Sequence, residues 1–232
     1  MELRVQVFGE AALLVELGEE PELGISARVH ALARALEAEP PRGLRSLVPG
    51  YVSLLVELDP LQADLASVER VLREHAQHID AVLTPEGRQR QRTIPTVYGG
   101  EWGPDLDEVA HRIGLTASEV IARHIAAPQS VYMLGFSPGF PYLGDLPSEL
   151  ALPRRTTPRE RVPVGSVAIA GRQTGIYSRE MPGGWHLLGR TPVPLFDPAR
   201  NPPAYLGPGD SVRFEPIDAG EWERFAGPPP DW

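Results

Sequence analysis

The chain of 232 residues contains no cysteine, and its 22 basic residues are all arginine, so lysine is absent as well. Without cysteine there are no disulfide bonds, thiolate nucleophiles or zinc–thiolate sites, which is compatible with a reducing cytoplasm. Without lysine the chain cannot form a lysine Schiff base, carry biotin or supply the lysine of a P-loop. We therefore expect no biotin or other lysine-linked cofactor on this chain.

Long apolar runs are also missing, and the charged N-terminus shows no secretory signal, so we expect a cytoplasmic protein without a membrane-spanning helix. The net charge of −9 disfavours nucleic-acid binding, because no basic excess exists to neutralise phosphates. Between residues 145 and 190, however, the sequence contains seven arginines and only four acidic residues. This local surplus fits either a confined anion site or a solvated surface with scattered arginines.

Alternating apolar residues in the first part of the chain predict strands near residues 3–7, 13–17, 44–48 and 52–58. Helical spacing predicts a helix over 25–36 and a second from Asp59 to about residue 83, with Leu61 on its buried face. The order predicts one antiparallel sheet with two helices on one face. His75 and His78 on the second helix lack a third ligand, so we interpret them as surface residues rather than a metal site.

Composition divides the chain into a first domain over 1–84, a polar linker over 85–92 and a second domain over 93–232. In the second domain we predict a strand over 93–98, a helix capped by Asp105, and a helix with a Thr116–Glu119 capping box. Residues 131–210 hold 11 glycines and 13 prolines, against 5 of each in residues 1–80. Short apolar segments between these residues favour a β-barrel or sandwich.

Three blocks carry the candidate chemistry. Residues 135–144 (GFSPGFPYLG) form a stiff loop that suits either a ligand or a rigid corner. Residues 153–163 are rich in arginine, whose planar fork suits carboxylate or phosphate. In the third block, Gln173 can hydrogen-bond an amide or lactam and His186 can exchange a proton near neutral pH, although a lone strand histidine is often structural. We thus predict catalytic roles for His186 and Gln173, and substrate or anion binding by Arg155, Arg159, Arg161, Arg190, Tyr177, Gly183 and Gly184.

The segments LGFSPGFPYLG (134–144), PRRTTPRERVPVGSVAIAGRQTGIY (153–177) and PGGWHLLGRTPVPLFDP (182–198) closely resemble the B-subunit family of bacterial 5-oxoprolinase. This family is also called KipI-like or allophanate hydrolase subunit 1. The resemblance extends upstream and downstream over most of the chain. It implies an α+β fold class, with a ferredoxin-like α/β N-terminal domain and a cyclophilin-like β-barrel C-terminal domain.

The resemblance also implies a function shared between different chains. In that family, the B subunit works with a homologous barrel protein, the C subunit, and with a third chain, the A subunit, to open 5-oxo-L-proline to L-glutamate with ATP. Our leading hypothesis is therefore an ATP-hydrolysing 5-oxoprolinase subunit. We expect it to be inactive alone, because a chain without lysine or a P-loop is not expected to hold ATP and magnesium unaided. Two alternatives stay open: a KipI-type inhibitor of a sensor histidine kinase, and the carboxyltransferase-like half of a biotin-dependent amidolyase.

Overall fold

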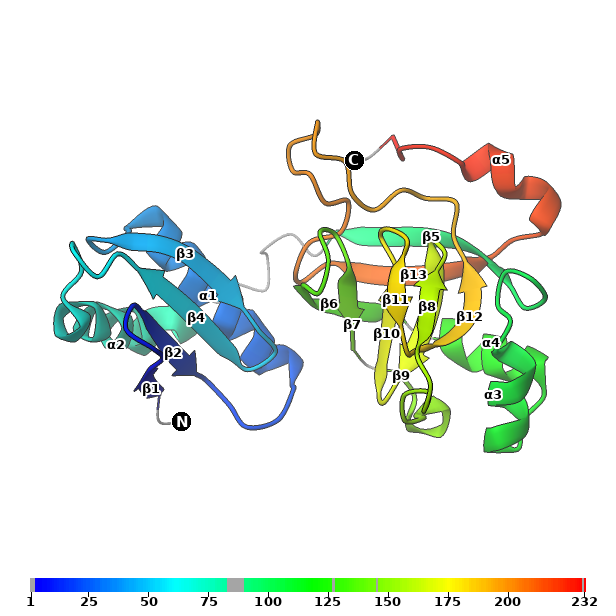
Figure 1. Ribbon diagram of the computed structural model, residues 1–232, viewed down its shortest axis with the longest axis horizontal. Coiled ribbons are helices and arrows are strands. Elements are labelled where there is room, and N and C mark those ends of the chain that lie inside the picture. The colour runs from blue at the N-terminus through cyan, green and yellow to red at the C-terminus, as the bar shows by residue number, and fades with distance from the viewer. Residues whose placement is uncertain (1–2, 83–89, 127, 145, 231) are drawn as a thin grey trace. The chain divides into compact units, whose positions relative to one another are not determined.

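The fold is described from a computed structural model that covers residues 3–82, 90–126, 128–144, 146–230 and 232 (Figure 1). The chain divides into two compact units, residues 1–88 and 89–232, and each is treated by itself. Most of the linker predicted at 85–92 lies outside the described residues, so its exact extent stays a prediction. The mixture of a helix-covered sheet and a closed barrel confirms the predicted α+β fold class.

The first unit contains a four-stranded antiparallel sheet in the order β1–β2–β4–β3. Two helices pack on one face of it, where alternate strand residues such as Leu13, Val15 and Val56 meet Leu32 and Leu72 in one core. The predicted ββαββα order is confirmed, with these bounds: β1 (Arg4–Val7), β2 (Ala12–Glu16), α1 (Leu23–Ala38), β3 (Leu44–Pro49), β4 (Ser53–Leu58) and α2 (Leu65–Val82).

The start of α2 differs from the prediction. Asp59 does not cap this helix: its carboxylate accepts from the backbone N of Leu61 at 3.0 Å and from the Gln62 amide at 2.9 Å, which closes a separate turn. Asp64 caps the helix instead, through the backbone N of Ser67 at 3.2 Å. Leu61 is consequently 93% exposed, and its predicted burial was wrong.

Seven strands of the described second unit close into a barrel in the order β10–β7–β6–β13–β5–β12–β9. All of its pairs are antiparallel except the parallel pair of β5 and β13. Their bounds are β5 (Gln91–Tyr98), β6 (Gln129–Leu134), β7 (Pro141–Leu143), β9 (Ser166–Ala170), β10 (Gln173–Ile176), β12 (His186–Arg190) and β13 (Ser211–Pro216).

Shorter elements surround this barrel. Strands β8 (Arg159–Val162) and β11 (Met181–Gly183) pair with each other as a separate ribbon. Helix α3 (Leu106–Ile113) ends at Gly114 with φ 72°, and α4 (Ala117–Ile125) begins with the predicted Thr116–Glu119 capping box. Figure 1 shows α3 and α4 together beside the barrel. The remaining elements are 3-10 turns η1 (Ser148–Leu150) and η2 (Ala219–Glu221) and the short helix α5 (Trp222–Phe225).

The barrel strands have apolar side chains on both faces. Inside, residues such as Val131, Leu143, Val167, Ile176 and Phe214 form the barrel core. Outside, the alternate residues of β9, β10 and β12 are covered by the β8–β11 ribbon, and they form a second cluster, which we call the outer cluster: Phe140, Val162, Ala168, Ala170, Tyr177, Trp185 and Leu187. The outer face of these strands is therefore a packed surface rather than a solvated one.

His124 on α4 is a buried structural residue. Its ring packs 4.6 Å from that of Phe214, its Nδ1 lies 2.8 Å from the Tyr98 hydroxyl, and its Nε2 lies 3.2 Å from the Thr174 hydroxyl. Burial lowers the pKa of His124 to about 3, because the charged imidazolium loses its hydration there. The histidine is thus neutral at physiological pH.

Candidate functional site

Register places Gln173 and Tyr177 on the outer face of the barrel. Gln173 pairs with Ala170 and Gly175 pairs with Ala168, and residues that are paired or two apart project to the same side. Gln173, Gly175 and Tyr177 therefore share the face that carries Trp185 in the outer cluster. The Gln173 amide is half-buried and has no hydrogen-bond partner among the described residues, so its donor and acceptor are open to a ligand.

An aromatic group lines this face, centred on the ring of Phe140. Its centroid lies 5.0 Å from Tyr142, 5.2 Å from Tyr177 and 5.9 Å from Trp185, all in edge-to-face contact. Phe140 and Tyr177 are buried, whereas Tyr142 is half-buried. A Cβ at Gly175 would lie 2.6 Å from the Phe140 ring, so the missing side chain lets the aromatic rings pack onto the strand.

The loop before Phe140 is held in an unusual conformation. Phe136 has φ 63°, in the left-handed region that a bulky residue rarely adopts, and the residue is 63% exposed. The backbone N of Gly135 donates to the Phe140 carbonyl at 3.1 Å, and the Ser178 hydroxyl donates to the Pro138 carbonyl at 2.7 Å. The loop is therefore a rigid corner that also displays one aromatic ring to solvent.

Asp105 binds two of the predicted anion-binding arginines. Its carboxylate accepts two hydrogen bonds from Arg159, at 2.6 and 2.9 Å, and one from Arg155 at 2.9 Å. It also accepts from the backbone N of Leu187 at 2.7 Å, and its own N–H donates to the Leu187 carbonyl at 3.1 Å. Asp105 thus ties residues 153–163, which we call the arginine segment, to β12 at Leu187. The forks of Arg155 and Arg159 are directed at this internal carboxylate.

The environment of Asp105 keeps it ionised. Burial by itself would raise the pKa of this carboxyl, but the hydrogen bonds from Arg159 and Leu187 and the positive charges of Arg159 and Arg155 outweigh burial, and the pKa is lowered. Only 3% of the Asp105 side chain is exposed, compared with 26% for each arginine. The result is a buried carboxylate that holds two cations at the base of the arginine segment.

His186 lies on the opposite face of the sheet from Gln173. It pairs with Ile169, whereas its neighbours Trp185 and Leu187 belong to the outer cluster, so alternation turns its ring away from them. The ring is fully buried, and its Nε2 donates to the Pro153 carbonyl at 2.9 Å. Its Nδ1 has no hydrogen-bond partner among the described residues. The structure does not bring the two predicted catalytic side chains together.

Gly183 and Gly184 serve two different contacts. A Cβ on Gly183 would collide with the Tyr177 hydroxyl, so this glycine makes room for the phenol. Gly184 has more space, since the nearest atom to an added Cβ is a Pro158 carbon at 3.6 Å, and its carbonyl accepts from the backbone N of Arg155 at 2.8 Å.

Burial raises the pKa of Tyr177, and the hydrogen bond between its hydroxyl and the Trp185 backbone offsets part of this rise.

The other two predicted anion-binding arginines are not bound to Asp105. Arg161 is exposed on β8 and has no ion-pair partner within the described ranges. Arg190 is at the far end of β12, where its Nε donates to the Val164 carbonyl at 2.6 Å. Its guanidinium lies 5.8 Å from the ring centre of Trp102 and 5.4 Å from that of Trp222, which indicates a packing role.

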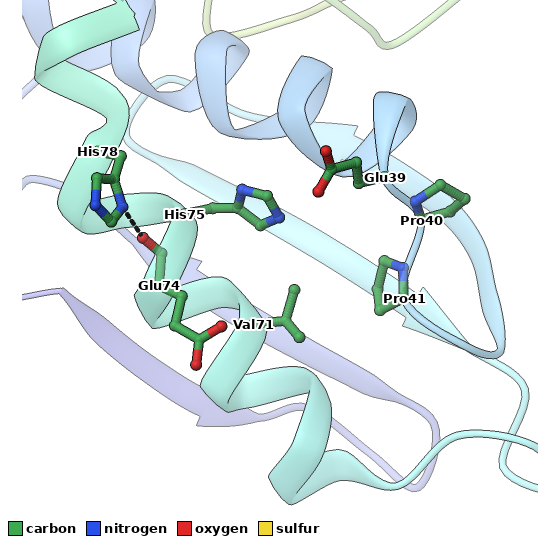
Figure 2. Close-up of a pocket in the computed structure, with 7 residues that line it drawn as sticks. All are labelled: Glu39, Pro40, Pro41, Val71, Glu74, His75 and His78. Carbon is green, nitrogen blue, oxygen red and sulfur yellow. Dashed lines mark hydrogen bonds between the residues drawn. The ribbon is translucent and has the colours of Figure 1, made fainter.

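A separate cavity of about 490 Å³ lies in the first unit, between the end of α1 and α2 (Figure 2). His75 and His78 line it together with Glu39 and Glu74, and His78 Nδ1 donates to the Glu74 carbonyl at 2.8 Å. Across the part of the chain that is described, no group of three or more His, Cys, Asp or Glu side chains is placed to hold a metal ion. None of the described helices is long and apolar enough to cross a membrane.

Residues 3–206 match the family described as carboxyltransferase domain, subdomain C and D. The chain belongs to this family. It is 39% identical to the protein named as the B subunit of 5-oxoprolinase in Bacillus subtilis, over 232 residues that cover 96% of each chain. The solved structure of TTHA0988 is 41% identical with a TM-score of 0.78, and covers 90% of this chain, which spans only 40% of that one. The urea amidolyase of Saccharomyces cerevisiae is 25% identical over 94% of this chain and 13% of its own length.

These relationships confirm the resemblance found in the sequence, and the name of the Bacillus relative describes it as one subunit of a larger enzyme.

The sequence analysis missed the role of Asp105, because the pattern around this residue indicates only a helix cap. It occupies the N-cap position of α3, yet its side chain makes no cap hydrogen bond. Nothing near Asp105 in the sequence indicates its partners, because they follow 50 and 54 residues later.

Proposed function

We propose that this chain is one subunit of an ATP-dependent 5-oxoprolinase, acting with a homologous barrel protein (the C subunit) and a third chain (the A subunit) to convert 5-oxo-L-proline into L-glutamate. The observation that carries the proposal is the similarity to a 5-oxoprolinase B subunit over 96% of both chains. A match along the whole length of a single subunit favours the same division of labour between chains. The open amide of Gln173 beside the outer cluster is consistent with a lactam ligand.

The proposed chemistry explains why ATP is needed. Amide resonance makes the five-membered lactam a poor electrophile, and transfer of the γ-phosphoryl group of ATP to its carbonyl oxygen activates the ring carbon. Water then adds to that carbon, the ring C–N bond breaks, and the nitrogen takes up a proton. A second water hydrolyses the resulting acyl phosphate to L-glutamate and phosphate. ATP and its magnesium ion would occupy a site shared with the other subunits, because this chain has no lysine or P-loop.

Within this proposal, Gln173 hydrogen-bonds the lactam amide. We assign His186 a supporting role instead of proton transfer, because its buried ring faces away from Gln173 and already donates to Pro153. The proton on the leaving nitrogen would then come from water or from one of the other chains. This assignment replaces the catalytic role that the sequence pattern predicts for His186.

Reconstitution tests the proposal directly. The A and C subunits are purified and assayed for oxoproline-dependent release of phosphate and glutamate, with and without this chain. We expect coupled activity only when all three proteins are present. Gln173→Ala should lower the coupled rate while the complex still assembles. The exposed Gln62 of the first unit provides the matched control Gln62→Ala, which should leave the rate unchanged. Full activity of the A and C subunits without this chain would refute the proposal.

The match to urea amidolyase favours one second candidate, the carboxyltransferase-like half of a biotin-dependent enzyme. Biotin would have to be carried by another protein, because this chain has no lysine to attach it. This candidate predicts activity that depends on a biotinylated partner and is abolished by avidin. The oxoprolinase reaction should be insensitive to avidin, so a single assay separates the two.

A further inference from the structure

The segment containing Arg154 is fixed on both sides before any ligand binds. On one side the Pro153 carbonyl accepts a hydrogen bond from His186 Nε2 at 2.9 Å. On the other, the backbone N of Arg155 donates to the Gly184 carbonyl at 2.8 Å. These contacts attach the segment to β12 and to the turn that precedes it, so the position of the Arg154 backbone is set by the fold.

Arg154 differs from Arg155 and Arg159 in having its charge available. Arg155 and Arg159 direct their guanidinium groups to Asp105. Arg154 is exposed, and within the described ranges it has no ion-pair partner. An unpaired guanidinium on a fixed backbone is suited to bind a carboxylate through two parallel hydrogen bonds.

The surroundings of Arg154 are aromatic. Its guanidinium carbon lies 6.0 Å from the ring centre of Trp185, whose ring in turn lies 5.9 Å from that of Tyr142. The charge of Arg154 also acts on the phenols of Tyr142 and Tyr177, where it opposes the larger effect of burial on their pKa values. Of these rings Trp185 and Tyr177 are buried and Tyr142 is half-buried, so a cation beside the Tyr142 ring matches a small, flat ring that bears one carboxylate.

We propose that Arg154 binds the carboxylate of 5-oxo-L-proline, with the lactam ring beside Tyr142 and its amide directed towards Gln173. This inference rests on the proposed function and deepens it. It transfers to Arg154 the anion-binding role that the sequence pattern predicts for Arg155, Arg159 and Arg161. Asp105 and His186 then act as positioning residues, because they hold the segment on either side of Arg154.

The test uses the assembled complex and two substrates, 5-oxo-L-proline and its neutral carboxamide, in steady-state assays. Loss of a hydrogen-bonded charge pair should raise KM for the acid at least about tenfold in Arg154→Gln, with kcat little changed. KM for the carboxamide should stay the same, so the preference for the acid disappears. Arg154→Lys keeps the charge and should restore part of this preference, which loss of structure alone would not produce.

Arg213→Gln is the matched control, since Arg213 is an exposed barrel arginine on β13, away from the outer cluster, and both KM values should be unchanged. An Arg154→Gln complex that keeps its preference for the acid, or that loses kcat alone, overturns the inference while leaving the proposed function intact. Activity that does not depend on this chain overturns the proposed function itself, and the inference with it. The two failures are therefore distinguishable.

Discussion

Replacing Asp105 with asparagine should destabilise the barrel unit strongly. The carboxylate accepts three hydrogen bonds from two arginines and one from the Leu187 backbone, and it is itself buried. Asparagine keeps a single oxygen acceptor and turns its NH₂ donors towards the guanidinium groups of Arg155 or Arg159. Breaking a buried charge pair by removing one partner costs about 3–5 kcal/mol. Since each arginine is 26% exposed and regains some hydration, we expect about 3 kcal/mol.

Tryptophan fluorescence during urea unfolding measures this loss selectively, because all four tryptophans lie between residues 102 and 232, in the second unit. About 3 kcal/mol corresponds to a decrease in Tm of roughly 6–12 °C for a unit of this size. Glu108→Gln is the control: Glu108 is 53% exposed and lies 3.7 Å from Arg155, so its loss should cost under about 0.5 kcal/mol. A loss below about 1 kcal/mol in Asp105→Asn would refute the view that this carboxylate organises the arginine segment.

The same variant has a defined pH signature. The pKa of Asp105 is lower in the folded protein than its ordinary value of 3.8, so its ionised form stabilises the fold above that value. This contribution is lost as the pH falls below 3.8 towards the folded pKa. The stability difference between the native chain and Asp105→Asn should therefore be constant from pH 8 to about 5 and shrink below about pH 4. A difference that shrinks near neutral pH would point to another group.

Two further predictions concern the same unit. Gly183→Ala should lower the free energy of unfolding in urea by about 1–3 kcal/mol, because its methyl group collides with Tyr177. Gly184→Ala has room for the methyl group and should lower it by less than about 1 kcal/mol. Equal effects of the two substitutions would contradict the close contact at Gly183. Buried His124 has a pKa of about 3 in the folded protein, compared with an ordinary 6.5, so below pH 6.5 only the unfolded chain takes up the proton. The free energy of unfolding of the barrel unit should therefore fall by up to about 1.4 kcal/mol per pH unit as the pH decreases below 6.5. His124→Gln should remove this slope, and a slope that persists would assign it elsewhere.

Local patterns were sufficient for the first unit, whereas in the second they left a barrel and a sandwich open. Alternation in β2 and β4 and helical spacing in α1 describe the first unit, because each pattern places apolar residues on the one face that is buried. The error at Asp59 has a local cause. An aspartate followed by proline is equally suited to cap a helix or to close a turn, and only Asp64, five residues later, decides between them.

The candidate site was harder to predict from the sequence, since its geometry depends on strand register. Gln173 and His186 are both polar residues in short strands, and their sequence positions do not reveal that they project to opposite faces. That result follows only when Gln173 is paired with Ala170 and His186 with Ile169. A shift of register by one residue would have exchanged the two faces. The resemblance of the motifs to the B-subunit family therefore located the candidate site, while the pairing of the strands showed on which face of the sheet each side chain lies.

The arginine surplus between residues 145 and 190 illustrates how a count of charges overstates an anion site. Asp105 lies outside that window, yet it binds Arg155 and Arg159 within it, and Arg190 is packed against two tryptophan rings at the other end of β12. Three of the seven arginines are therefore engaged within the protein, and two of them fasten an irregular segment to the barrel. Arg154, Arg161, Arg172 and Arg179 are exposed. Of these, Arg154 lies beside Trp185, and in our proposal it binds the ligand's carboxylate at a place that Asp105 determines by holding the neighbouring arginines.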